Sequence, residues 1–315
     1  MEKRRLGRSR LEASVVGLGC NNFGGMIKSL DYAGAQAVIH AALDEGITLF
    51  DTSDSYGADG GSETTLGEAL GPRRKDVVLA TKFASPLNRA ADARYNGSRP
   101  YIMRAVEDSL RRLKTDYIDL YQYHFPDPLT PIDESLRALD DLVSQGKVRY
   151  VGCSNFAGWK LVDAAWTARQ GGLPSFLTTQ SEYNLLKRDA EVELLPALRA
   201  LDMSLLPYFP LASGLLTGKF RKGAPPPEGT RLDLAYFKSG LTDANLARVE
   251  ALIAFAEARG RSVLELAFSW LLAQSPVASV IAGATKSEQV RANARAASWR
   301  LSEAELVEID GLTRA

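Results

Sequence analysis

Short runs of apolar, β-favouring residues alternate with amphipathic helical stretches along almost the whole chain. Eight of these runs are predicted to be strands, at residues 15–18, 47–50, 77–81, 117–123, 148–152, 176–179, 204–207 and 278–281. Helices are predicted at residues 34–45, 63–70, 100–113, 132–144, 160–169, 191–201, 245–258, 263–273 and 288–297. Most of the strands are apolar throughout, which favours a closed parallel barrel over an open sheet. We therefore predict a single α/β domain over residues 1–315, built as a (β/α)8 TIM barrel.

Two segments stand outside the alternation. Residues 3–6 and 11–13, on either side of Gly7 and Arg8, predict an N-terminal β-hairpin that caps the barrel floor. Residues 209–243, after the seventh strand, form a long loop rich in glycine and proline. Loops of this length are usually functional or disordered. Because little apolar periodicity follows Lys219, we expect this loop to be weakly anchored and to fold over a ligand.

The charge balance and the residue counts narrow the classes of partner. Lys plus Arg and Asp plus Glu number 38 each, so no net field attracts nucleic acid or an anionic membrane. No run approaches the roughly 18 apolar residues that a membrane helix needs, and no signal-type apolar segment follows the basic N-terminus. Two cysteines and two histidines are too few for a disulfide framework or a metal cluster. These features predict a cytoplasmic protein with a small-molecule partner.

Ionisable side chains follow three consecutive strands of the predicted barrel. Asp51 and Tyr56 follow the second strand, Lys82 follows the third and His124 follows the fourth. Active sites of such barrels lie at the carboxyl ends of the strands, so these groups should meet. A buried Asp51 and Lys82 can pair with each other. The Lys82 ammonium would then favour the phenolate of Tyr56 and make it a better proton donor, while His124 would orient a carbonyl substrate.

These four residues, with their surroundings, resemble the catalytic tetrad of the aldo-keto reductase superfamily. The segment DTSDSYG at Asp51 is similar to the family's Asp-Thr-x-x-x-Tyr-Gly, and YIDLYQYHFP ending at Pro126 resembles its strand-four signature. GCSNF at Gly152 and QSEYN at Gln180 resemble two further motifs, and YFPLASGLLTGK and IAGATKSEQVRAN resemble the two cofactor segments. Six motifs in the family's order, spread over nearly the whole chain, make this a specific resemblance.

The resemblance implies a nicotinamide cofactor, NADPH in preference to NADH. Ser154, Asn155 and Gln180 should hold the carboxamide, and Tyr208 should stack on the nicotinamide ring. Lys286 stands where a helix start offers free N–H groups to a phosphate, whereas Gln289 replaces an arginine that many relatives carry. The other residues expected at the cofactor are Cys20, Asn21, Asp51, Pro210, Leu211, Ser213, Gly214, Leu216, Lys219, Gly283, Thr285 and Asn293.

The substrate is expected to be a small aldehyde or ketone. Phe23, Phe83 and Phe125 each follow a strand end, so we expect them to line an apolar mouth. The first loop, Gly19 to Phe23, lacks the Thr-Trp pair common in the family, so substrate specificity cannot be carried over. Two other functions stay open: a cofactor-binding regulatory subunit with little turnover, and a phosphate-handling barrel that binds no nicotinamide.

Overall fold

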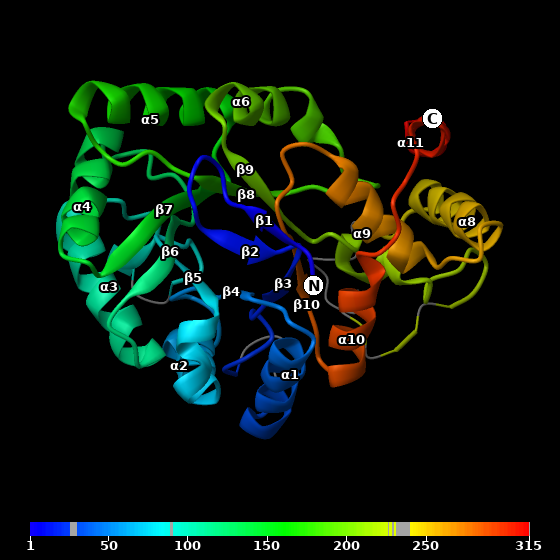
Figure 1. Ribbon diagram of the computed structural model, residues 1–315, viewed down its shortest axis with the longest axis horizontal. Helices are drawn as coiled ribbons and strands as arrows, with labels where there is room; N and C mark the ends of the chain where they lie inside the picture. The colour runs from blue at the N-terminus through cyan, green and yellow to red at the C-terminus, as the bar shows by residue number, and fades with distance from the viewer. Residues whose placement is uncertain (26–29, 89–90, 226, 229, 231–239, 315) are drawn as a thin grey trace.

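A computed structural model describes residues 1–25, 30–88, 91–225, 227–228, 230 and 240–314. Its centre is an eight-stranded parallel sheet in the order β10-β3-β4-β5-β6-β7-β8-β9, with helices around it (Figure 1). The strands are β3 (Val16–Gly19), β4 (Leu49–Asp51), β5 (Val78–Phe83), β6 (Ile118–Tyr123), β7 (Val148–Ser154), β8 (Thr178–Glu182), β9 (Ser204–Tyr208) and β10 (Val280–Gly283). The sheet closes where the Leu205 N–H donates to Pro276 O at 3.0 Å and the Ala278 N–H donates to Leu205 O at 3.1 Å. The prediction of a (β/α)8 barrel is confirmed.

The helices cover the outside of the barrel. They are α1 (Tyr32–Asp44), α2 (Gly61–Leu70), α3 (Arg99–Leu113), α4 (Ile132–Ser144), α5 (Gly158–Gly171), α6 (Leu194–Leu201), α8 (Asp243–Glu257), α9 (Val263–Ala273), α10 (Ser287–Ala296) and α11 (Glu303–Thr313). Within the described residues, no helix combines the length and the apolar character that a membrane span requires. All eight predicted strands are present, and their ends shift by a few residues.

The barrel interior is layered from apolar to polar along the strand direction. Side chains on a strand alternate between its two faces, so every second residue points into the barrel. Leu49, Val78 and Leu120 pack in one buried cluster inside the barrel. The inward positions further along those strands are polar, namely Asp51, Lys82, Gln122 and His124. The polar layer therefore lies at the carboxyl ends of the strands.

An N-terminal hairpin, β1 (Lys3–Arg5) and β2 (Glu12–Ser14), lies across the other end of the barrel (Figure 1). Leu6 is fully buried and belongs to the interior apolar cluster. Gly7, which has a φ of 50°, approaches the barrel so closely that a Cβ there would lie 2.6 Å from Leu177 O. Its N–H donates to Ser204 Oγ at 2.8 Å. The predicted cap of the barrel floor is confirmed.

The loop after β9 is better anchored at its start than the sequence predicted. Leu215 and Leu216 lie in a short 3-10 segment (Ala212–Thr217) and are buried in the core, as is Phe220. Arg221 Nη2 pairs with Glu250 Oε2 on α8 at 2.8 Å. The expectation of weak anchoring was therefore wrong for residues up to 221, because these apolar side chains reach the helix layer. Residues 226, 229 and 231–239 of the predicted loop lie outside the described residues.

The last helix, α11, was not predicted. Ser302 and Glu305 form a capping box at its start, in which each side chain bonds the other residue's backbone N–H. This Ser-x-x-Glu pattern is visible in the sequence and could have identified the helix. Arg259 Nη2, just after α8, pairs with Glu308 Oε2 at 2.7 Å and ties α11 to the barrel wall.

We predict that Leu6→Ala lowers the free energy of unfolding by about 2–5 kcal/mol, because it leaves a cavity between the hairpin and the barrel floor. Urea denaturation measures this. Leu11→Ala, on the same hairpin but only partly buried, is the control and should cost clearly less. Equal losses for the two variants would show that the hairpin does not plug the barrel.

Candidate active site

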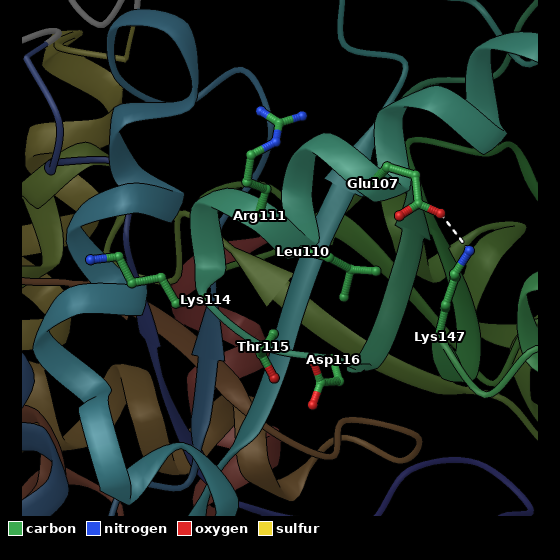
Figure 2. Close-up of a pocket in the computed structure, with 7 residues that line it drawn as sticks. All are labelled: Glu107, Leu110, Arg111, Lys114, Thr115, Asp116 and Lys147. Atoms are coloured by element: carbon green, nitrogen blue, oxygen red, sulfur yellow. Dashed lines mark hydrogen bonds and ion pairs between the residues drawn. The ribbon is translucent and has the colours of Figure 1, made fainter.

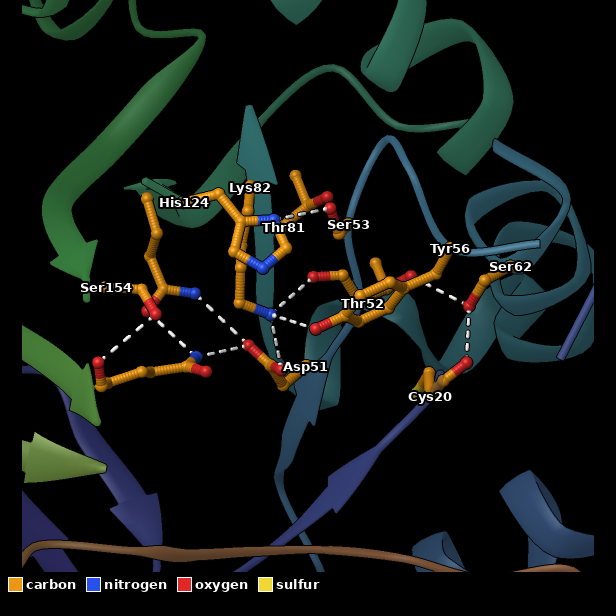
Figure 3. A network of polar contacts seen from close by, with 12 residues as sticks. Cys20, Asp51, Thr52, Ser53, Tyr56, Ser62, Thr81, Lys82, His124 and Ser154 are labelled. Atoms are coloured by element: carbon orange, nitrogen blue, oxygen red, sulfur yellow. Dashed lines mark hydrogen bonds and ion pairs between the residues drawn. The ribbon is translucent and has the colours of Figure 1, made fainter. Parts of the chain in front are cut away.

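A buried ion pair lies at the centre of the polar layer. Lys82 Nζ is 2.6 Å from Asp51 Oδ2, and the two side chains are 1% and 4% exposed. The ammonium also donates to Thr52 O at 2.9 Å and reaches the Tyr56 hydroxyl at 3.5 Å (Figure 3). An ammonium has three protons to donate, so these three oxygens account for all of them.

Two glutamine amides hold the other oxygen of Asp51. Gln180 Nε2 donates to Asp51 Oδ1 at 2.5 Å, and Gln122 Nε2 does so at 3.2 Å. Gln180 Nε2 also lies 3.0 Å from Gln122 Oε1, which joins the amides to each other. A buried carboxylate is costly unless its lone pairs are filled, and here the pair and the amides fill them. The sequence reasoning missed Gln122, although it alternates with Leu120 and His124 on the inward face of β6.

Tyr56 and His124 face each other above this pair. Their rings meet edge to face with centroids 5.8 Å apart, and Lys82 Nζ lies 4.9 Å from the centroid of the Tyr56 ring. Tyr56 comes from the loop between β4 and α2, and His124 follows β6. The four residues that the sequence pointed to are thus brought together at one rim of the barrel.

Burial determines the protonation of both rings. Burial raises the pKa of the Tyr56 hydroxyl, and the nearby Lys82 ammonium opposes this rise without cancelling it. The Lys82 ammonium thus favours the phenolate, as expected from the sequence, but desolvation of the hydroxyl outweighs it and the net pKa is raised. Burial, together with the charge of Lys82, holds the pKa of His124 well below its usual range. At neutral pH the phenol keeps its proton and the imidazole is neutral.

The ends of β6, β7 and β9 are joined by a second set of hydrogen bonds. Asn155 Nδ2 donates to His124 O at 2.9 Å and to Ser154 Oγ at 3.0 Å. The Tyr208 hydroxyl donates to Asn155 Oδ1 at 2.9 Å. Ser154 Oγ in turn donates to Gln180 O at 3.2 Å. These contacts bring together the four residues that the family resemblance assigned to the nicotinamide, namely Ser154, Asn155, Gln180 and Tyr208.

Backbone conformation also marks this rim. Nine of the described residues other than glycine have a positive φ, and five of them follow strand ends or begin the loop after β9: Ala84, Asn155, Phe209, Ala212 and Ser213. Such conformations cost free energy and gather at functional sites. They are an observation independent of the side-chain chemistry, and they fall at the same end of the barrel as the ion pair.

The residues predicted for the phosphate and adenosine parts of a cofactor lie in two neighbouring segments. Pro210, Leu211, Ser213 and Gly214 surround the start of the 3-10 segment, and Lys219 is exposed. Leu216 is fully buried. The buried Cys20 follows β3, and a Cβ on Gly283 would lie 3.7 Å from Asn21 Oδ1, which places the first loop against the end of β10.

The start of α10 is arranged around Gln289. Its Oε1 accepts from the Thr285 N–H at 2.7 Å and lies 3.2 Å from Thr285 Oγ1. Lys286, at the N-cap position, is exposed, and Asn293 is buried. An exposed cation beside the free N–H groups of a helix start suits a phosphate group, so these residues fit the cofactor that the sequence implied.

Two of the three phenylalanines expected at a substrate mouth are core residues. Phe23 and Phe83 are fully buried. Phe83 follows the inward-facing Lys82 on β5, so it points outward and packs against Tyr121 and Tyr123 with ring centroids 4.9 Å apart in both contacts. Neither can line an open mouth. Phe125 is half-buried and packs on His124 with centroids 4.9 Å apart, and its role at a substrate mouth stays a prediction.

A chain of polar side chains behind His124 was not singled out from the sequence. Ser53 Oγ lies 3.2 Å from His124 Nδ1 and 3.2 Å from Asp54 Oδ1, so both are within reach of its single proton. Asp54 Oδ2 accepts from Tyr101 at 3.0 Å and from Asn88 at 3.1 Å. Burial, and secondly the charge of Glu63, raise the pKa of Asp54 to about 6. The signal in the sequence was the run of polar residues inside DTSDSYG.

A depression on the outer surface is a separate feature. Figure 2 shows Glu107 of α3 pointing toward Lys147, whose Nζ pairs with Glu107 Oε1 at 2.5 Å. Thr115 and Asp116 precede β6, and Lys147 precedes β7, so this surface lies at the amino ends of the strands. It is remote from the rim that carries the ion pair. In the described part of the chain, no group of His, Cys, Asp and Glu side chains could hold a metal ion.

Comparison with known proteins places this arrangement in a family. Residues 15–314 match the family model described as the aldo/keto reductase family. The chain is 37% identical to the uncharacterized oxidoreductase YrpG of Bacillus subtilis, over 96% of this chain and 93% of that protein. It is 36% identical to the aldo-keto reductase YhdN of Bacillus subtilis, over 98% and 93% of the two chains. It is 35% identical to a probable voltage-gated potassium channel subunit beta of Oryza sativa, over 94% and 91%.

The raised pKa of Asp54 makes stability depend on pH. Between its ordinary pKa of 3.8 and the folded value of about 6, the folded protein holds a proton that the unfolded chain releases. The free energy of unfolding therefore falls as pH rises through this window, by about 2–3 kcal/mol. Asp54→Asn should lack this loss, so its stability relative to the wild type should rise by that amount between about pH 4 and about pH 7.

Urea denaturation at the two pH values measures this difference. Asp163→Asn, which changes an exposed carboxyl on α5, is the control and should keep a constant difference from the wild type. A constant difference for Asp54→Asn as well would show that Asp54 titrates alike in the folded and unfolded chains.

Proposed function

The chain belongs to the aldo/keto reductase family, and we propose that it reduces an aldehyde or ketone to an alcohol, with a proton from Tyr56. The observation that carries the proposal is the edge-to-face placement of Tyr56 and His124 above the Lys82–Asp51 pair. A nicotinamide cofactor supplies the hydride for the carbonyl carbon. The protein supplies the proton for the carbonyl oxygen and the geometry.

Tyr56 is suited to donate that proton. Its raised pKa keeps the proton on the phenol at neutral pH. The Lys82 ammonium donates toward the phenol oxygen, which leaves the phenol's own proton free to be donated elsewhere. When the proton leaves, the phenolate forms beside a cation, and this lowers the free energy of the transition state. Asp51 keeps Lys82 in place and charged, because its carboxylate raises the pKa of Lys82 against the effect of burial.

His124 is suited to orient the carbonyl group. A neutral imidazole carries one N–H, which can donate to the carbonyl oxygen without competing as an acid. His124 lies at edge-to-face distance from Tyr56, so one oxygen can contact both side chains. Phe125, half-buried against His124, would provide apolar surface for the rest of a carbonyl substrate.

The residues around the rim fall into groups, each of which would hold one part of the cofactor. Ser154, Asn155 and Gln180 would bind the carboxamide and Tyr208 would stack on the nicotinamide ring. Pro210, Leu211, Ser213, Gly214, Leu216 and Lys219 would line the pyrophosphate. We propose NADPH in preference to NADH, because Lys286 is an exposed cation at the start of α10. Cys20, Asn21, Asp51, Gly283, Thr285, Gln289 and Asn293 complete the proposed cofactor contacts.

We also propose a cytoplasmic location and a single domain over residues 1–315. Both cysteines, Cys20 and Cys153, are free and buried, which suits a reducing compartment. A barrel that begins with its own floor hairpin and closes through β9 and β10 needs no second domain to complete its core.

A second candidate function is a regulatory subunit that binds the cofactor and turns over little. The similarity to a protein named as a probable channel subunit favours it. A panel of aldehydes and ketones, tested with NADPH and with NADH, separates the two functions. Turnover of any carbonyl at an ordinary enzymatic rate supports the reductase, and cofactor binding without turnover supports the subunit.

We predict that Tyr56→Phe lowers kcat by about two to four orders of magnitude, because it removes the acid and little else. Cofactor binding, measured by quenching of protein fluorescence, should be unchanged. Tyr32→Phe, at the exposed start of α1, is the control. A Tyr56→Phe protein with near-normal kcat would rule out Tyr56 as the proton donor.

We predict that Lys286→Ala raises the KM for NADPH by about 10- to 100-fold and leaves the KM for NADH nearly unchanged. A charge-assisted contact with the 2′-phosphate contributes about 1.5–3 kcal/mol, and NADH lacks that phosphate. Lys219→Ala is the matched control, because a cation at the pyrophosphate should affect both cofactors alike. Equal effects of Lys286→Ala on the two cofactors would exclude this residue as the phosphate ligand.

A further inference from the structure

Ser53 is the side chain that contacts the inner nitrogen of the His124 ring. Its Oγ lies 3.2 Å from His124 Nδ1, and in Figure 3 the other ring nitrogen points toward Lys82 and Tyr56. Both residues are buried, at 0% and 6% exposure. The two ring nitrogens thus have different surroundings, one facing a serine hydroxyl and the other facing the proposed substrate position.

A neutral imidazole holds its proton on only one of these nitrogens. His124 is neutral because burial and the Lys82 charge lower its pKa. To donate toward a carbonyl, the ring must carry the proton on Nε2, and Nδ1 must then accept a hydrogen bond. The tautomer of such a ring is set by the partner of its other nitrogen. For His124 that partner is Ser53.

The surroundings of Ser53 favour donation to His124. A hydroxyl has two lone pairs and one proton. The Ser55 N–H donates to Ser53 Oγ at 3.3 Å, and the Ser55 hydroxyl lies 3.0 Å from the same atom. Ser55 is buried, and among the hydrogen bonds of the described residues its hydroxyl has Ser53 as its partner. When Ser55 donates through both groups, the lone pairs of Ser53 are filled, so Ser53 cannot accept from His124 and must donate.

Asp54 is the other acceptor within reach of the Ser53 proton. Its Oδ1 lies 3.2 Å from Ser53 Oγ, which is long for a hydroxyl bound to a carboxylate, normally about 2.5–2.7 Å. Tyr101 and Asn88 already donate to Asp54 Oδ2. The pKa of Asp54, which burial raises to about 6, still leaves the carboxyl mostly charged at neutral pH, so its weakness as a competitor rests on the long contact and on the donors it already has. Asp54 therefore competes weakly with His124 for this proton.

We propose that Ser53 is a positioning residue: it donates to Nδ1 of His124, fixes the ring orientation and keeps the His124 proton on Nε2, where it can reach a carbonyl oxygen. This inference rests on the proposed reductase function for the role of the Nε2 proton. The assignment of the tautomer itself rests only on the contacts around Ser53.

The test measures two properties of the same variants, the tautomer of His124 and the rate of turnover. The chain has two histidines, so a 15N-labelled sample gives two imidazole signals, and a His40→Asn variant assigns them. At neutral pH the wild-type spectrum should show the His124 proton on Nε2. Ser53→Ala should shift the proton partly or wholly to Nδ1, and Ser53→Thr, which keeps a hydroxyl, should restore the wild-type pattern. Ser85→Ala, a buried serine whose hydroxyl accepts from the Leu87 N–H, is the matched control.

Kinetics on the same proteins completes the test. Ser53→Ala should lower kcat by about 10- to 100-fold, by analogy with removing the partner that orients a metal-bound imidazole, with the NADPH dissociation constant unchanged. A wild-type proton on Nδ1, an unchanged tautomer in Ser53→Ala, or an unchanged kcat in that variant would overturn the proposal. If the wild-type chain turns over no carbonyl, the reductase function fails, and the imidazole spectra still decide what Ser53 does to His124.

Discussion

An ammonium and a carboxylate buried side by side impose much of the polar arrangement in the barrel. Desolvating two such charges is expensive, and their attraction offsets the cost only when further hydrogen bonds satisfy both groups. The amides of Gln122 and Gln180 meet this need at Asp51, and Thr52 O and the Tyr56 hydroxyl meet it at Lys82. One of these partners, the Tyr56 hydroxyl, is also the proposed proton donor. The hydrogen bonds that stabilise the buried ion pair therefore also position the reacting group.

The barrel keeps this polar layer rigid by filling the space beneath it. The N-terminal hairpin closes the floor with Leu6, and the apolar cluster above it fills the interior up to the ion pair. A close-packed interior has few ways to rearrange, so the polar side chains keep one geometry. The strained backbone at Ala84, Asn155 and Phe209 lies at the opposite end, around the ion pair, where such strain is typical of a functional site.

The strand order and the location of the site could be predicted from the sequence for a simple reason. Runs of apolar residues of strand length, each followed by a helical pattern, have few alternatives to a parallel barrel, and such barrels place polar residues at strand ends. The capping box of α11 and the inward Gln122 were equally visible and were overlooked. Phe83 was misplaced because it follows a strand end in sequence, yet the two-residue alternation with Lys82 turns it outward.

The sequence by itself determined which residues form strands and which ionisable groups reach the rim, because periodicity and strand ends are local properties of the chain. Only the tertiary structure decided how those groups affect one another. The pKa of Tyr56 depends on how far burial outweighs the Lys82 charge, and the partner of His124 depends on a serine 71 positions away in the chain. Desolvation and contacts between distant residues arise only once the barrel has closed, so no local pattern encodes them.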